Sequence, residues 1–371
     1  MHKQNNEKIS YRVGSLDGLR AIACLGIISM HVRANLTISM SPFISRNNFI
    51  SFAGNFVLLF MMISAFSLCC DYLQKFHQNS ISLEAFYKRR FSRILPFFAF
   101  LTFIDLVKCL FENHFVFNDS IVGELWESFA NVTLMFGLLP GNGINVVGVG
   151  WFVGAIFLFY LLFPFYSTLL MSKKRVWFAF IISIIWSFAI TTYFTPVKGA
   201  FSARSCFLLE APYFIAGGIL FLYMPNLNRL FKGKSLRIIT KSVVIAYTII
   251  FFSFPNLRFD FSNLLLYTLW IVYAISDLNS TFSRTLLNNR VMSFISGISL
   301  EMYLSHMMLF RIVEKIHLER MIGDGDIVYC LTLILVLCST IVFSLCWKKI
   351  EKKLPICINV VENTLVKLRA S

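Results

Sequence analysis

Apolar segments long enough to cross a lipid bilayer recur along almost the whole of this chain. A hydrocarbon layer about 30 Å thick takes roughly 20 helical residues, and backbone groups inside it must be hydrogen-bonded within the protein. The sequence therefore predicts an all-α polytopic membrane protein with about ten transmembrane helices, at 19–39, 49–70, 94–111, 149–170, 176–194, 206–223, 238–254, 260–277, 297–314 and 326–347. The shorter run 128–139 is expected to be re-entrant or interfacial.

The composition argues against an ordinary soluble fold. Only 14% of the residues are charged and 57% are hydrophobic, whereas soluble domains are nearer a quarter charged. We expect one membrane domain over residues 1–371, with short tails at about 1–14 and 348–371 and no appended soluble domain. The nine cysteines form no Cys-x-x-Cys pair, and no His/Cys cluster has zinc-like spacing, so no metal site is predicted.

The basic side chains carry topological information. If the N-terminus lies in the cytosol, 24 of the 34 Lys and Arg residues fall in cytosolic segments, which is the distribution that membrane insertion favours. We therefore expect both termini to be cytosolic. Loop retention and attraction to anionic membrane lipids account for the net charge of +15, so membrane lipids are expected as partners and nucleic acid is not.

The first apolar segment contains Arg20 and His31. Eleven helical steps turn about 1100°, so both side chains lie on one face, about 16 Å apart. Asp17 precedes Arg20 by three residues and is expected to pair with it. Ionisable groups inside a membrane usually mark a pathway or a reaction site. A histidine that simply hydrogen-bonds between packed helices is the alternative.

A second polar stripe lies in the segment 297–314. Ser299, Tyr303 and His306 follow one another at helical spacing, whereas Glu301 falls off the stripe and can hydrogen-bond with Ser305. Interhelical hydrogen bonding explains the two serines. For His306, that interpretation and a functional one are equally open.

An arginine cluster precedes the third apolar segment. Arg90 and Arg93 belong to the run Lys88-Arg-Arg90-Phe-Ser-Arg93-Ile-Leu-Pro96. The cluster can serve to retain this loop in the cytosol. It can equally bind a phosphorylated donor, because arginine holds phosphate oxygens bidentately.

These motifs occur in an order typical of one protein family. They are Asp17-Gly-Leu-Arg20 through His31, Phe60-Met-Met-Ile-Ser64-Ala-Phe66, Tyr87 through Pro96, Gly150-Trp151 through Tyr160-Leu-Leu-Phe-Pro164, and Ser299 through His306. On this ordered set the chain resembles the acyltransferase-3 family of integral membrane O-acyltransferases, in particular those that O-acetylate surface polysaccharides.

The resemblance implies a reaction and a set of roles. Acyl-CoA, here expected to be acetyl-CoA, is the co-substrate, and a hydroxyl of a surface glycan or lipid-linked sugar is the acceptor; no bound cofactor is implied. His31 would be the general base, with an unperturbed pKa of about 6.5. Arg20, held by Asp17, would orient the donor, and Arg90 with Arg93 would hold its phosphates. The possible pocket residues are Trp151, Tyr160, Tyr303 and His306.

The chain also departs from the family pattern. Many members carry a glutamate five residues after the tryptophan of the fourth segment, where this chain has Ile156. Many also carry an appended esterase-like domain, so here transfer is expected to be direct or through a separate partner. The family implies a multi-pass protein of the bacterial cytoplasmic (inner) membrane. The alternative function is a proton-coupled transporter or flippase in which His31, Arg20, His306 and Glu301 act as relays.

Overall fold

The computed structural model describes residues 13–134, 136, 148–194, 207–276 and 281–370, and these parts of the chain contain helices but no strand. The first half comprises α1 (Gly14–Asn35), α2 (Pro42–Ser45), α3 (Asn48–Phe52), α4 (Phe56–Leu68), α5 (Gln74–His77), α6 (Leu83–Glu112), α7 (Asp119–Val132) and α8 (Trp151–Leu169). A π-helical turn, Cys69–Leu73, joins α4 to α5.

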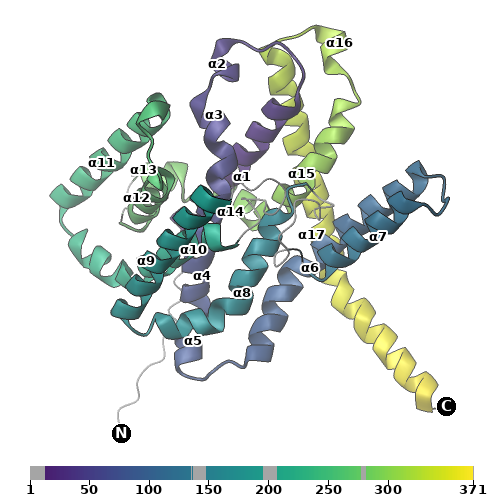
Figure 1. Ribbon diagram of the computed structural model, residues 1–371, viewed down its shortest axis with the longest axis horizontal. Coiled ribbons are helices and arrows are strands. Elements are labelled where there is room, and N and C mark those ends of the chain that lie inside the picture. The colour runs from purple at the N-terminus through teal and green to yellow at the C-terminus, as the bar shows by residue number, and fades with distance from the viewer. Residues whose placement is uncertain (1–12, 135, 137–147, 195–206, 277–280, 371) are drawn as a thin grey trace.

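The described part of the second half is also helical (Figure 1). It comprises α9 (Lys173–Ala189), α10 (Phe207–Leu230), α11 (Lys234–Ser253), α12 (Ser262–Ser276), α13 (Thr281–Leu286), α14 (Arg290–Gly297), α15 (Ser299–Glu314), α16 (Leu318–Ile322) and α17 (Asp326–Ala370). Helix α17 extends through the expected tail at about 348–371 as far as Ala370.

Eight stretches of the described chain are helices long and apolar enough to cross a membrane. They are Gly14–Asn35, Pro42–His77, Leu83–Glu112, Trp151–Leu169, Lys173–Tyr193, Phe207–Leu230, Lys234–Ser253 and Asp326–Lys353. The expected segments 260–277 and 297–314 are also helical, but α12 has 15 residues and α15 has 16. Both are shorter than the roughly 20 residues a straight span requires. The protein is thus an all-helical integral membrane protein, while the count of ten and the sides of the termini stay predictions.

Helix α1 lies among α4, α12, α14, α15 and α17, all of which contact it. Glycines permit this close packing, as they commonly do between membrane helices. A Cβ on Gly18 would meet the backbone of Leu287, and one on Gly26 would meet the ring of Phe56. The polar side chains of α1 are therefore positioned by neighbouring helices instead of projecting into lipid.

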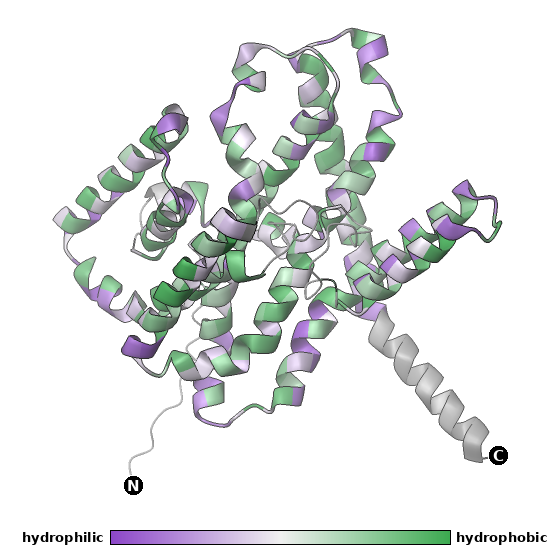
Figure 2. Ribbon diagram, viewed as in Figure 1, coloured by the Kyte–Doolittle hydropathy of each residue, from purple (hydrophilic) through white to green (hydrophobic). Residues whose placement is uncertain are grey.

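The peripheral helices expose apolar side chains. On α11, Ile239 and Ile249 are more than half exposed, and Phe178 on α9 is equally open. Figure 2 shows largely hydrophobic surfaces along both helices. Without a bilayer such exposure would be costly, so these faces are the ones that lipid covers.

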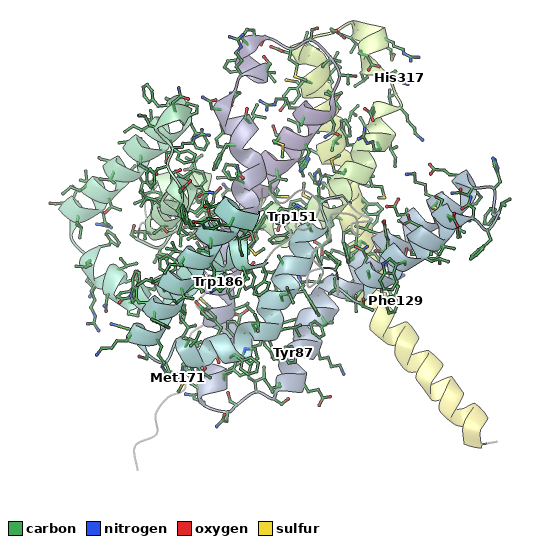
Figure 3. The ribbon with its side chains drawn as sticks, in the orientation of Figure 1. Tyr87, Phe129, Trp151, Met171, Trp186 and His317 are labelled. Carbon is green, nitrogen blue, oxygen red and sulfur yellow. The ribbon has the colours of Figure 1, made fainter. Side chains whose placement is uncertain are left out.

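Helix α7 runs beside α6, and the pair extends away from the rest of the protein (Figure 1). The outer face of α7 is apolar, with Trp126 and Phe129 more than half exposed. Figure 3 shows Phe129. The run 128–139, expected to be re-entrant or interfacial, begins within α7, which ends at Val132. Residues 135 and 137–147 lie outside the described chain. An amphipathic helix of this kind suits a membrane interface.

Candidate active site

A cavity of about 1140 Å³ brings together motifs that are far apart in the sequence. Its walls come from α1, the α4–α5 stretch, α6, α8 and the junction between α14 and α15. Asp17 and Arg20 line it from one side, and Arg90 and Arg93 from another. Arg89 and Lys75 are also in its wall, so cationic side chains outnumber the carboxylates Asp17 and Asp71. Such a cavity suits an anionic ligand.

Asp17 and Arg20 form the pair expected from their spacing. Arg20 Nη1 lies 3.2 Å from Asp17 Oδ1, and Arg20 Nη2 donates to Ser67 Oγ at 3.3 Å. Ser296 Oγ donates to the same Asp17 oxygen at 3.0 Å. Asp17 is only 7% exposed. Its carboxylate accepts hydrogen bonds from Arg20 and Ser296, and it holds the guanidinium of Arg20 in place. The pair thus ties α1 to α4 and to α14 at the cavity wall.

Arg90 is held by an aromatic side chain that the sequence motifs did not point to. Its Nη2 donates to Tyr72 Oη at 2.7 Å, and its guanidinium lies 4.6 Å from the centre of the Tyr72 ring. The ring of Tyr160 lies 6.0 Å away from the same guanidinium. Tyr72 belongs to the π-helical turn Cys69–Leu73, and single π turns frequently occur at functional sites.

Helix α8 presents one face to the cavity. Phe152, Ile156 and Tyr160 line it, four residues apart and hence on one side of the helix. Trp151, expected in the pocket, does not line it, because it is one position off that face; Figure 3 shows it at the start of α8. Ile156 is almost fully buried, so an apolar side chain stands in this wall where many family members have a carboxylate.

His31 and His306 lie together but outside the lining of this cavity. Their ring centroids are 5.0 Å apart and the ring planes are inclined by 50°. Tyr303 connects the two regions: it lines the cavity, and its ring centroid lies 6.0 Å from that of His306. The Tyr303 hydroxyl donates to the carbonyl of Val149 at 2.8 Å. His306 lies nearly one helical turn farther along α15 than Tyr303, and it is not among the residues that line the cavity.

Glu301 hydrogen-bonds with Ser305, as expected, but through its backbone carbonyl, and its carboxylate pairs with a residue of α17. Its carboxylate lies 2.6 Å from Lys348 Nζ on α17, and the same amine also contacts Glu351 at 2.9 Å. Ser305 Oγ donates to the backbone carbonyl of Glu301. Glu301 is 1% exposed. This buried ion pair joins α15 to α17, and neither residue lines the cavity.

The architecture and the cavity define a class of protein: a multi-pass helical membrane protein with polar motifs that converge on one cationic cavity. Comparison with protein families then gives the family. The model of the acyltransferase-3 family, described as an acyltransferase domain, matches residues 13–347. The chain belongs to this family, and it is a membrane acyltransferase.

Two further comparisons bear on the assignment. The chain is 26% identical to a Haemophilus influenzae protein over an alignment of 220 residues, which covers 54% of this chain and 89% of that protein. That relative carries the name "Uncharacterized protein", so it adds no activity. No solved structure matches the chain.

Proposed function

We propose that this protein is a membrane O-acyltransferase that moves an acetyl group from cytosolic acyl-CoA to a hydroxyl of a surface glycan or lipid-linked saccharide. The membrane would be the bacterial cytoplasmic membrane. The observation that carries the proposal is that the Asp17–Arg20 pair and the Arg90/Arg93 cluster line the same cavity. A residue set that served only to retain a loop would have no reason to enclose a volume of this size.

The cavity fits an acyl-CoA donor in charge and in size. Coenzyme A carries several phosphate groups, and arginine side chains hold phosphate oxygens through paired hydrogen bonds. The volume of about 1140 Å³ exceeds the roughly 300–1,000 Å³ of common small-molecule sites. Phe60, Phe152 and Ile156 supply apolar wall for the acyl and pantetheine portion.

In the proposed reaction His31 is the general base. It takes the proton from the acceptor hydroxyl while the hydroxyl oxygen attacks the thioester carbonyl carbon. The carbon–sulfur bond then breaks, the thiolate of coenzyme A leaves, and the proton passes from His31 to sulfur. Arg20, fixed by Asp17 and Ser67, orients the donor. Holding both reactants against each other supplies much of the rate increase.

The test uses membrane vesicles from cells that express the protein and from cells that lack it. Vesicles receive acetyl-CoA labelled in the acetyl group, or a longer-chain acyl-CoA, and the glycan and lipid fractions are then treated with mild base to release esters. Base-labile label that depends on the protein supports the enzyme. If the vesicles take up a saccharide in a gradient-dependent way and no ester forms on it, the result would instead support the transporter. Deleting the gene and identifying the glycan that loses its esters would name the acceptor.

A further inference from the structure

The second histidine of the pair, His306, has an environment that the proposed mechanism does not use. Its side chain is fully buried on α15, between α1 and α17. Nδ1 lies within hydrogen-bond distance of the backbone carbonyl of Tyr303. A carbonyl oxygen only accepts hydrogen bonds, so Nδ1 must carry the proton. In a neutral ring Nε2 is then a bare acceptor.

That acceptor is unpaired although it is buried. Among the described residues, Nε2 has no hydrogen-bond partner. Buried polar groups are nearly always paired, and an unpaired one in a protein interior calls for an explanation. The nearest ring that can supply an N–H is His31, whose centroid is 5.0 Å away. At this separation a small rotation of either side chain brings the two ring edges into hydrogen-bond contact.

We propose that His306 is a positioning residue for His31: its bare Nε2 accepts a hydrogen bond from a ring N–H of His31 and thereby fixes which nitrogen of His31 faces the acceptor. The inference rests on the proposed function. When His31 takes the hydroxyl proton it gains a second N–H, and His306 holds the first one throughout. His306 itself neither gains nor loses a proton, so the proton balance of the transfer is unchanged.

This arrangement corresponds to the orienting group of a nucleophile–base–orienter triad. The orienter here is a neutral imidazole held by a backbone carbonyl and not a carboxylate. A neutral orienter suits a buried position, because a carboxylate without a cation would be strongly disfavoured there. The Tyr303 carbonyl, His306 and His31 would form one chain of hydrogen bonds during catalysis.

Two substitutions separate positioning from packing. His306→Gln places an amide oxygen near the former Nε2 and keeps an acceptor for His31. His306→Asn places its amide near the former Nδ1, so it keeps the contact with the Tyr303 carbonyl but offers nothing to His31. Ser305→Ala is the matched control, because Ser305 is equally buried on α15 but donates only to the Glu301 carbonyl.

The vesicle assay with labelled acetyl-CoA is read as maximal transfer rate per amount of protein and as KM for acetyl-CoA. We expect His306→Asn to lower the maximal rate about 100-fold, the effect typical of a misplaced catalytic group. His306→Gln should stay within about tenfold of the parent protein. The KM for acetyl-CoA should change less than about twofold in both, since His306 lies outside the donor cavity. Ser305→Ala should match the parent.

A purely packing role predicts the opposite order, with Asn at least as active as Gln because it keeps the Tyr303 contact. That order, or equal rates for the two variants, overturns the inference, as does a loss that appears only in KM. Thermal stability in detergent shows whether both variants fold. If the parent protein itself transfers no label, the proposed function fails; if the parent is active and the order is reversed, only the role of His306 fails.

Discussion

The guanidinium of Arg90 lies over the ring of Tyr72, 4.6 Å from its centre, and donates a hydrogen bond to the hydroxyl of the same residue at 2.7 Å. One aromatic side chain thus fixes both the plane and the direction of the guanidinium. Arg90 lines the cavity, where we place the donor phosphates. A cation that is preorganised in this way loses less conformational entropy when it binds a phosphate.

Removal of the Tyr72 hydroxyl should therefore weaken donor binding. Tyr72→Phe keeps the ring beneath Arg90 but loses the hydrogen bond, and a bond to a charged group contributes about 1.5–3 kcal/mol. We expect KM for acyl-CoA to rise roughly tenfold with little change in maximal rate. Tyr87→Phe is the control, because the Tyr87 hydroxyl donates to the Leu161 carbonyl and does not line the cavity. Equal KM values for both variants would exclude a role for Tyr72.

The arginines themselves can be tested without altering charge. Arg90→Lys and Arg93→Lys keep the positive charge that retains this loop in the cytosol, but lysine lacks the planar fork that binds phosphate bidentately. Each should leave membrane insertion intact and raise KM for acyl-CoA by roughly tenfold or more. If KM is unchanged in both variants and in the double variant, the cluster serves only topology.

His31→Ala should abolish transfer. Removal of a general base lowers the rate by about 10²–10⁴-fold. The side chain of His31 is partly exposed, so its replacement by the smaller alanine should permit normal membrane insertion. The measurement is label transfer in vesicles, normalised to the amount of protein detected by immunoblot. Undiminished transfer by the variant would rule out His31 as the base.

Local spacing predicted part of the site well. Helical periodicity alone places Asp17 beside Arg20, and the structure shows that pair. The same rule places Phe152, and not Trp151, on one face with Ile156 and Tyr160.

Other features depend on contacts between distant parts of the chain. Ser67 and Ser296 bind Arg20 and Asp17, but a serine in an apolar helix carries no signal of which helix it will face. Tyr72 is brought to Arg90 by a π-helical turn, which no pattern of residues in the sequence predicts. For Glu301, the sequence suggested its neighbour Ser305, and the fold supplies Lys348 from the last helix. Span length was the weakest point, since α12 and α15 are shorter than the apolar segments that contain them.

Topology can be tested independently of catalysis. The division of basic residues predicts that reporters fused after residues 80, 173, 233, 285 and 360 lie in the cytosol, and that those after residues 43, 120, 198, 257 and 322 lie on the opposite side. A pair of reporters specific for either side of the membrane would be fused at each position. Two neighbouring fusions that report the reverse order would show that a span has been miscounted, with α12 and α15 the first to re-examine.

The ion pair between Glu301 and Lys348 should matter for stability. Its carboxylate is 1% exposed and one of its oxygens has no hydrogen-bond partner in the described chain, so Lys348 supplies most of its compensation. Removing one member of a buried pair costs about 3–5 kcal/mol, because the other charge stays buried without a partner. Lys348 retains 21% side-chain exposure, which points to the lower part of that range.

Lys348→Met should therefore lower the midpoint of thermal unfolding in detergent. Lys349→Met is the control, since that neighbouring side chain is exposed and surface charges contribute little. Adding Glu301→Gln to Lys348→Met removes the unpaired carboxylate and should recover much of the loss. If Lys348→Met unfolds at the same temperature as Lys349→Met, or if Glu301→Gln brings no recovery, the pair is not what holds α17 against α15.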